Sequence, residues 1–395
     1  MTDTAESIDP GELLFTGDVS KPQDTYNTLR QRCPVARSDM FGNPTVYLSR
    51  YEDVCFAMRH PEYFSSETDG MDLGEQPLIP LQVDPPRHTQ YRRLLNPRFV
   101  PREIEKLEPD VRSLVRTLLD GFADRGECDF HEEFATPLPS GIFLALMGLS
   151  MDDLPKFLQW RDNTIRPDVE PGDFDGAAEI RKQTGREVSD YFRAAIAAKR
   201  AEPDDRLFSQ IIHATIDGRE LTETELLGIA HLLLLGGLDT VTATLDCMIT
   251  YLAEHPDRRQ MLIDEPKRII PAVEELLRHE TPVMIVPRQM KQDMEMGGVM
   301  LKAGERVNLV LGAANLDDDE FGDTSVDFGR LPNKHVAFGG GNHLCLGAHL
   351  ARLELWVALE EFHARIPNYR IASDEPLRFS PGIRQADSLP LAWDV

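Results

Sequence analysis

The sequence predicts a mainly α-helical protein with a small β region. Apolar residues recur at three- and four-residue spacing, with charged residues between them, in four long segments: 103–122, 151–163, 175–200 and 221–254. Runs typical of strands are few and short, namely 45–48, 307–311 and 389–393. No low-complexity linker or repeat divides the chain, so we expect a single domain over residues 1–395.

The charge balance argues against polyanionic partners. Acidic residues outnumber basic ones, 67 against 42, and the formal net charge is −25, so the average field repels nucleic acid and anionic lipid. Residues 1–15 contain four acidic residues, no Arg or Lys and no apolar run typical of a signal peptide. The longest apolar segment, 229–238, is shorter than the ~20 residues that a membrane helix needs. We therefore expect a cytoplasmic protein that binds neither nucleic acid nor membrane.

Five cysteines are scattered along the chain without close pairing: Cys33, Cys55, Cys128, Cys247 and Cys345. The odd number and the wide spacing argue against a disulfide framework and for a reducing compartment.

The segment from Thr222 to His255 predicts one long helix through the core. Thr222 and Glu225 form a capping box at its start, and Pro256 ends it. In its middle, Gly236 and Gly237 each cost about 1 kcal/mol of helix stability relative to Ala. The Thr240 hydroxyl can compete for the Gly236 carbonyl and open a kink. Asp239 and Thr240 beside bare backbone are compatible with a proton relay, or with a simple packing kink and a solvated acid.

A pair of opposite charges, Glu275 and Arg278, shares one face of the helical stretch 270–279. Taken alone, this spacing is typical of a surface ion pair.

A glycine-rich turn presents Cys345 just before a helix. Residues 338–352 read Phe-Gly-Gly-Gly-Asn-His-Leu-Cys-Leu-Gly-Ala-His-Leu-Ala-Arg, and residues 351–362 continue with helical spacing. The amide groups and the dipole at a helix N-terminus stabilise a thiolate, which is the form that binds a soft metal. Glycines on both sides of Cys345 allow the backbone to approach a flat ligand closely.

Other kinds of site are compatible with parts of this turn. The glycine spacing does not match a phosphate-binding loop. A zinc site could use His343, Cys345 and His349, although a second close Cys or His pair is absent from the sequence. A nucleophilic cysteine would need a base that the sequence does not place.

The turn resembles the haem-binding loop of the cytochrome P-450 superfamily, because it matches F-G-x-G-x-H-x-C-x-G-x-x-L-A-R at every fixed position. The resemblance extends over almost the whole chain. It implies a triangular helical body in which haem b lies between the long central helix and the helix after the cysteine loop. It makes Cys345 the axial iron ligand, with Phe338, Gly339, Gly347 and Gly236 shaping the haem pocket.

The same resemblance assigns roles to the other motifs. Gly236 and Gly237 would make room for dioxygen, and Thr240 and Asp239 would deliver protons. Glu275 and Arg278 would be the E-x-x-R pair, completed by Arg330, although Val326 stands where an aromatic residue or Pro is common. The haem propionates would be held by residues on several segments: His88 and Arg92 in the D-P-P-x-H-x-x-x-R segment that starts at Asp84, and Arg288 and His343.

The resemblance also places the substrate pocket on mainly aliphatic segments. Its candidate residues are Gln76, Leu78, Leu232, Leu235, Val283 and Ile285, with 382–384 nearby. Gly-Gly-Leu-Asp-Thr at 236–240, the run from Cys128 and Pro-Leu-Ala-Trp-Asp at 390–394 look most like the camphor-hydroxylase branch. We therefore expect hydroxylation of a small terpenoid or alicyclic molecule, the alternative being a steroid or another larger lipophile.

Electrons must come from outside, because no flavin-binding or iron–sulfur cysteine pattern lies in this chain. We expect a ferredoxin with its NAD(P)H-dependent reductase, or a flavodoxin, to dock on a cationic patch of Arg92, Arg93, Arg98, Lys334 and Arg352. Three rivals remain: a peroxygenase, which the acid–alcohol pair argues against, a haem sensor or carrier without turnover, and a zinc hydrolase.

Overall fold

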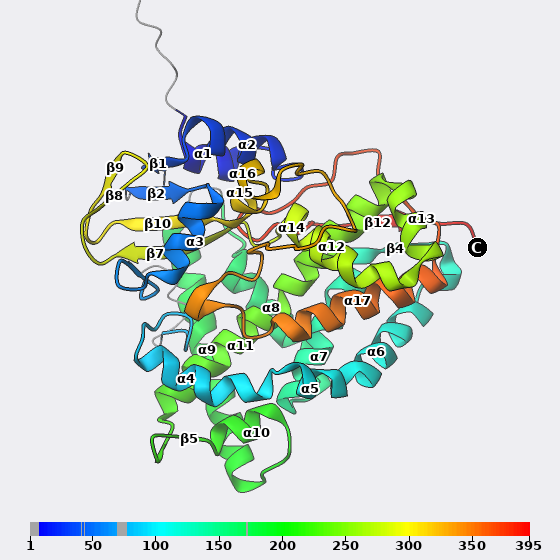
Figure 1. The fold of residues 1–395 in the computed structure, drawn as a ribbon. Coiled ribbons are helices and arrows are strands. Elements are labelled where there is room, and N and C mark those ends of the chain that lie inside the picture. Colours follow the sequence, from blue (N-terminus) through cyan, green and yellow to red (C-terminus); the bar gives the residue numbers. More distant parts are fainter. Residues whose placement is uncertain (1–7, 41, 43, 69–76, 171–172) are drawn as a thin grey trace, which may run out of the picture. The chain divides into compact units, whose positions relative to one another are not determined.

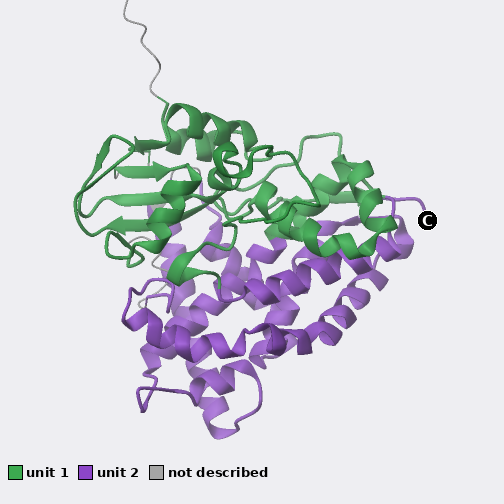
Figure 2. Cartoon of the chain, viewed as in Figure 1, with its two compact units in different colours: residues 1–68, 243–345, 369–391 green, residues 69–242, 346–368, 392–395 purple. Residues whose placement is uncertain are grey.

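The computed structural model describes residues 8–40, 42, 44–68, 77–170 and 173–395, and it is mainly helical with short strands (Figure 1). The predicted fold class is confirmed. The chain separates into two compact units, each made of non-contiguous segments (Figure 2). Unit 1 comprises residues 1–68, 243–345 and 369–391, and unit 2 comprises residues 69–242, 346–368 and 392–395. The expectation of one domain over the whole chain stays a prediction.

Unit 1 contains a five-stranded sheet in the order β1-β2-β10-β7-β3. Its strands are β1 (Val35–Ser38), β2 (Thr45–Leu48), β3 (Phe64–Ser65), β7 (Ile285–Met290) and β10 (Arg306–Val310). Strand β10 pairs with β2 in parallel and with β7 in antiparallel orientation. The predicted strand at 45–48 is confirmed, and the one at 307–311 is shifted by one residue because Leu311 already begins a helix. A two-stranded ribbon adds β8 (Met294–Met296) and β9 (Val299–Leu301).

Unit 1 also contains several helices. They are α1 (Pro10–Thr16), α2 (Gln23–Arg32), α3 (Tyr51–Arg59), α13 (Pro256–Asp264), α14 (Ile269–Glu280), α15 (Leu311–Asn315) and α16 (Asp318–Phe321). Helix α1 begins where the Asp9 carboxylate accepts hydrogen bonds from the amides of Gly11 and Glu12. The apolar side of α3 packs on the sheet through buried residues such as Val54 and Met58. A short strand, β11 (Arg370–Ile371), lies in the C-terminal part of this unit.

Unit 2 is almost entirely helical. Its long helices are α4 (Arg87–Leu95), α6 (Glu108–Asp120), α7 (Pro137–Met147), α8 (Leu154–Ile165), α9 (Phe174–Ala201), α11 (Glu223–Leu238) and α17 (Ala348–Arg365). The shorter elements are α5 (Pro101–Ile104), α10 (Leu207–Ile212), β4 (Glu127–Asp129), β5 (Thr215–Ile216) and β6 (Arg219–Glu220). The last strand, β12 (Pro390–Ala392), begins in unit 1 and ends at the first residue of the last segment of unit 2, and it covers most of the predicted 389–393. Arg112 on α6 pairs with Glu360 at 2.7 Å and with Glu361, both on α17.

Two predicted helices are divided in the structure. The predicted helix at 103–122 becomes α5, a 3₁₀ turn and α6, because Pro109 lacks an amide donor and starts a new helix. The predicted rod from Thr222 to His255 is interrupted at Asp239, where the kink was predicted, and this divides it into α11 and α12 (Thr240–Glu254). The capping box of Thr222 and Glu225 is present as predicted.

The break at Asp239 has a local cause. The hydroxyl of Thr240 donates to the Gly236 carbonyl at 3.0 Å. It thereby competes with the backbone amide that would donate to this carbonyl in a regular helix. The stretch Glu223–Glu254 is long and apolar enough to cross a membrane by length and composition, but 67% of its most apolar window is buried inside the protein, as in a core helix.

Candidate active site

The loop around Cys345 is closed by its own backbone. The Cys345 amide donates to the Phe338 carbonyl at 2.9 Å, and two glycines in between, Gly339 and Gly341, have left-handed φ values of +70° and +62°. A Cβ on Gly341 would lie 2.2 Å from the Met58 carbonyl oxygen of α3. Only glycine fits at that position, so α3 and the loop fix the place of Cys345 in unit 1.

Cys345 differs from the other cysteines in its accessibility. It is exposed, whereas the other four are buried or half-buried. Burial raises the pKa of the thiols of Cys128 and Cys247 to about 12, and it also raises the pKa of Cys33 and Cys55. Cys345 is therefore the cysteine whose sulfur is accessible to a metal, and α17 begins three residues after it, at Ala348.

Gly347, beside the cysteine loop, and Gly236, on α11, each leave space for a flat ligand. A Cβ built on Gly347 or on Gly236 meets no atom of the described residues within 4 Å. Gly237 is different, because its Cβ would lie 2.9 Å from the Phe143 ring on α7. Gly237 thus serves helix packing, and the expectation that it makes room for dioxygen is not supported, since successive helical residues point to different sides. An accessible thiolate donor and glycine surfaces without side chains fit a haem-thiolate group.

The residues expected to hold the propionates lie in both units. In unit 2, His88 and Arg92 are one turn apart on α4, and His88 is buried. Burial, followed by the charge of Arg92, lowers the pKa of His88 to about 4, so its imidazole is neutral near pH 7. In unit 1, Arg288 on β7 is buried and donates to the Pro287 carbonyl at 2.7 Å, and His343 lies in the 3₁₀ turn Gly341–His343.

Asp239 lies in a buried ion cluster of unit 2. It is wholly buried, and its Oδ1 accepts from Arg166 at 3.0 Å and lies 3.8 Å from Arg161. Its Oδ2 has no hydrogen-bond partner in the described part of the chain. Arg161 also contacts the half-exposed Asp162 at 2.8 Å, so the cluster extends from the interior to the surface. No local pattern in the sequence marked Arg161 or Arg166 as partners of Asp239.

One face of α11 stays partly exposed within unit 2. Leu232, Leu235 and Gly236 lie on it, whereas Leu234 and Leu238 are buried. Because residues three and four apart share one side of a helix, the predicted substrate contacts Leu232 and Leu235 lie next to Gly236, which is predicted to make room for dioxygen.

Glu275 and Arg278 are both wholly buried, unlike the surface pair that their spacing suggests. Arg278 donates to the Glu275 carboxylate at 2.7 and 2.9 Å, and Arg330 donates at 3.1 Å. Asn333, which the sequence did not mark, donates at 3.0 Å, and the Asp327 amide at 2.9 Å. Burial alone would raise the pKa of Glu275, but the hydrogen bonds from Arg278 and Asp327 hold it below its usual value.

The remaining substrate candidates alternate in exposure. Val283 and Ile285 in unit 1 are partly exposed, whereas Met284 between them is buried, so the two predicted residues share a face. Leu78 in unit 2 is buried. Gln76 lies outside the described residues.

The predicted cationic patch is weaker than its composition suggests. Arg93 is exposed, but Arg98 donates to the carbonyls of Leu94 and Gln210, and burial lowers its pKa. Lys334 is paired with Glu320 at 2.9 Å. Arg92 and Arg352 are half-buried. Arg98 keeps its charge but is held by these carbonyls, so its part in a dock stays a prediction.

Within the residues that the structure describes, no group of three or more His, Cys, Asp or Glu side chains could hold a metal ion. The zinc site of His343, Cys345 and His349 is thus not supported.

This chain is similar to known proteins over nearly its full length. The family profile described as Cytochrome P450 matches residues 10–365. A steroid C26-monooxygenase of Mycobacterium tuberculosis is 34% identical over 93% of this chain and 92% of its own length. A probable cytochrome P450 127A1 of Sinorhizobium fredii is 37% identical over 89% of this chain and 84% of its own. The crystal structure of CYP109E1 from Bacillus megaterium in complex with testosterone superposes with a TM-score of 0.88 at 27% identity, covering 98% of this chain and 100% of that one.

Proposed function

Because the chain belongs to the cytochrome P450 family, whose members are haem-thiolate monooxygenases, we propose that Cys345 would bind the iron of a haem b and that the protein hydroxylates a lipophilic substrate. The observation that carries this proposal is the closed glycine loop, which presents the one exposed cysteine of the chain directly before α17. When bound, haem supplies an iron at which dioxygen and two electrons are used to place one oxygen atom in the substrate.

The family resemblance assigns a role toward this group to each of the following residues. Cys345 would bind the metal as a thiolate. Arg288 and His343 from unit 1, and His88 and Arg92 from unit 2, would hold the two propionates by hydrogen bonds and charge. A neutral His88 is suited to this role, because it can donate one N–H to a carboxylate without a buried charge of its own.

Proton delivery would depend on Asp239 and Thr240. The unpartnered Oδ2 of Asp239 can hold a proton, while Oδ1 stays fixed by Arg166. Arg166 and Asp162 would connect this carboxylate with the surface. The Thr240 hydroxyl, at the start of α12, donates to the Gly236 carbonyl, and this bond holds it beside the partly exposed face of α11 on which Gly236 lies.

For the substrate, the relatives favour a steroid or another large lipophile. One relative is a steroid C26-monooxygenase and a neighbour was crystallised with testosterone, while the likeness to the camphor-hydroxylase branch receives no support from these relatives. The partly exposed aliphatic residues Leu232, Leu235, Val283 and Ile285 are suited to either ligand class. Titration of the ferric protein with testosterone and with camphor distinguishes the two ligand classes. For a steroid enzyme, the spin-state shift should saturate at a lower concentration of testosterone than of camphor. For a terpenoid enzyme, it should saturate at a lower concentration of camphor.

We also propose a cytoplasmic enzyme that takes electrons from a ferredoxin and its NAD(P)H-dependent reductase, with Arg93 as the main docking charge because it is exposed. Arg93→Glu should slow electron transfer from a ferredoxin several-fold at low salt, while Arg186→Glu, which changes the net charge equally on α9, should not. Equal rates for both variants would contradict this dock.

The central experiment is the absorption spectrum of the reduced carbonyl adduct. The purified protein should show the red-shifted Soret band of sulfur ligation, Cys345→Ser should lose it, and Cys33→Ser should keep it. A protein without a Soret band, or a Cys345→Ser variant with an unchanged band, would refute the proposal. Substrate-dependent NAD(P)H consumption with matching product separates a monooxygenase from a haem carrier.

A further inference from the structure

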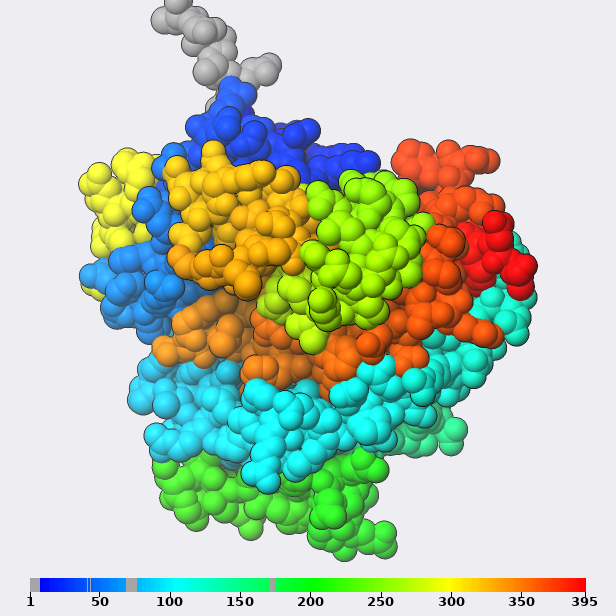
Figure 3. Space-filling view, turned by 45° about the vertical axis from the view of Figure 1, so that its right-hand side comes forward, coloured from blue at the N-terminus to red at the C-terminus, as the bar shows by residue number. Residues whose placement is uncertain are grey.

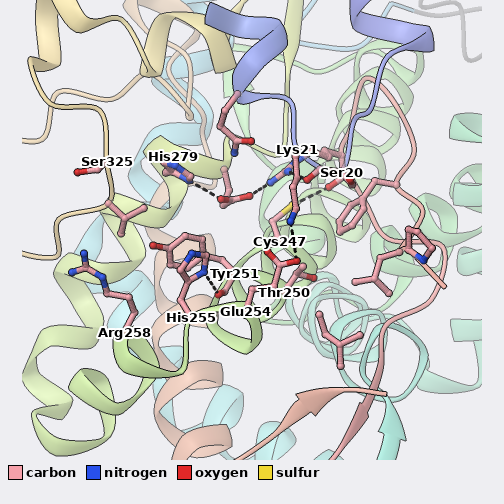
Figure 4. A pocket seen from close by; sticks show the side chains of 18 of the residues that line it. Ser20, Lys21, Cys247, Thr250, Tyr251, Glu254, His255, Arg258, His279 and Ser325 are labelled. Atoms are coloured by element: carbon pink, nitrogen blue, oxygen red, sulfur yellow. Dashed lines mark hydrogen bonds and ion pairs between the residues drawn. The ribbon is translucent and has the colours of Figure 1, made fainter. Parts of the chain in front are cut away.

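A cavity lies wholly within unit 1. Its lining contains none of the residues proposed to hold the haem, and its one link to the predicted substrate segments is Arg384, from 382–384. The cavity measures about 730 Å³, which is in the range of small-molecule sites. Its sides come from α12, from the start of α13, from the end of α14 and from 371–379 (Figure 4). In the space-filling view the yellow-green segment with α13 lies beside the amber segment with α16 (Figure 3). One residue from each part of the chain lines the cavity: Arg258 from α13, and Ser325, which follows α16 in the sequence.

The floor of this cavity contains hydrogen-bonding groups that the protein does not satisfy. Arg384 is buried, and its two terminal nitrogens donate to the Ser20 carbonyl at 2.9 Å and to the Glu280 carboxylate. Its Nε has no partner among the described residues, and neither has the buried hydroxyl oxygen of Thr250. Both residues line the cavity. An N–H donor and a hydroxyl at one end of a cavity call for a ligand with an oxygen acceptor.

The charges around the cavity are mostly compensated. Glu280 neutralises Arg384 on the floor, and Lys21 pairs with Glu254 at 3.3 Å on the rim, as Figure 4 shows. A carboxylate ligand would meet Glu280, and an ammonium group would offer no acceptor to Arg384. A neutral polar atom is therefore the best fit at the floor.

The rest of the lining is mixed: Asp257, Arg258 and Glu375 contribute charged groups, and the remainder includes an apolar and aromatic part. Ile371, Leu377 and Phe379 line it from the C-terminal segment, and Tyr251 lines it from α12, stacked on His255 with 4.1 Å between ring centroids. This apolar and aromatic part favours a compact hydrocarbon skeleton.

From these features we propose that the cavity binds a neutral lipophilic molecule bearing a hydroxyl or carbonyl oxygen, with that oxygen accepting from Arg384 and contacting Thr250. Binding at Arg384 would also affect the position of the neighbouring residues Gly382 and Ile383. Ile383 forms a β-bridge with Val283, and the Gly382 carbonyl accepts from Met284 at 3.0 Å. Because Val283 belongs to the proposed substrate pocket, an occupant of the cavity would alter substrate affinity, and this consequence alone rests on the proposed function.

The test uses the holoprotein and menthol as probe, with its parent hydrocarbon p-menthane as comparison. A diazirine derivative of menthol should label peptides with residues 250–255 and 371–379, and excess menthol should prevent this labelling. Competition by p-menthane should be about tenfold weaker, because it leaves the Arg384 donor unsatisfied. Thr250→Val should weaken menthol competition several-fold.

A pair of tryptophan variants controls for folding. Leu377→Trp fills the cavity and should abolish labelling of both peptides, whereas Met300→Trp, at an exposed apolar position on β9, should leave it unchanged. Labelling confined to residues 232–240 or 283–286, equal competition by p-menthane, or a crystal structure with only water in the cavity after menthol soaking would overturn the proposal. The carbonyl spectrum is independent of this labelling, so the two proposals fail separately.

Discussion

Glu275 in unit 1 and Asp239 in unit 2 are both wholly buried carboxylates next to two arginines, yet their hydrogen bonding differs. Both oxygens of Glu275 accept bonds, from Arg278 and Arg330 among others. Asp239 uses one oxygen for Arg166, and its second oxygen has no partner in the described part of the chain.

This difference distinguishes a structural from a chemical role. A buried charge whose lone pairs are all filled fixes the chain around it and has no site left for a proton. A buried carboxylate with one free oxygen keeps such a site, at a cost in stability. We therefore expect replacement of Glu275 to affect folding first and replacement of Asp239 to affect turnover first.

The largest effect should come from Glu275→Gln. The substitution keeps the shape but leaves the buried Arg278 and its neighbour Arg330 without a counter-charge, so the free energy of unfolding should fall by about 3–5 kcal/mol. The measurement is denaturant unfolding of the holoprotein. Glu274→Gln is the control, because Glu274 is partly exposed and lies 3.1 Å from His335, and it should cost less than about 1 kcal/mol. Similar losses of unfolding free energy in both variants would contradict the structural role of Glu275.

Asp239→Asn should act on turnover. Loss of the proton site should lower kcat about 100-fold, which corresponds to about 2.7 kcal/mol, and raise the solvent deuterium isotope effect. Its free energy of unfolding should fall less than that of Glu275→Gln, because Asp162 still compensates Arg161. Asp153→Asn, which removes a carboxylate bonded to Tyr191 in the same unit, should leave kcat unchanged. A normal kcat for Asp239→Asn would refute the relay.

The sequence could predict one of these two environments better than the other. The spacing of Glu275 and Arg278 gives their helical face, and the family resemblance adds Arg330, so most of this cluster was foreseeable. Its burial was not, because helical spacing is the same in a core and on a surface. The partners of Asp239 lie more than 70 positions earlier, Arg161 on α8 and Arg166 directly after its end. Nothing in their local sequence pattern predicts a contact that only tertiary packing creates.

The same distinction holds for the helices and the glycines. Periodicity predicted the long helices closely, as for α9 and α17, because it reflects burial of one face. It could not separate Gly236 from Gly237, which have the same residue type but face open space and Phe143 respectively.

His231 extends the comparison to a buried titratable side chain on α11, whose ring packs edge-on against Phe192. Neither ring nitrogen has a hydrogen bond within the described residues, and burial, followed by the charge of Arg193, lowers its pKa to about 4. Below the ordinary pKa of 6.5 the unfolded chain binds a proton here and the folded chain does not. Stability should therefore fall as the pH drops from about 6.5 to about 4, by roughly 2 kcal/mol from this group.

His231→Leu should remove that part of the acid sensitivity. The difference in unfolding free energy between variant and parent should grow in favour of the variant as the pH is lowered over this window. His213→Leu, at an exposed histidine of the same unit, should show no such trend. A constant difference between pH 7 and pH 4.5 would show that His231 takes up its proton in the folded protein.

Asp162→Asn should have the smallest effect and sharpen the route proposed for Asp239. Asp162 is half-exposed and lies 3.7 Å from Arg166, so water can replace part of its role and kcat should fall only about twofold to threefold. If both carboxylates lie on one path, the double variant Asp239→Asn with Asp162→Asn should be no slower than Asp239→Asn alone. A further drop of twofold to threefold in the double variant would mean that Asp162 acts separately, and that the proton reaches Asp239 by another path.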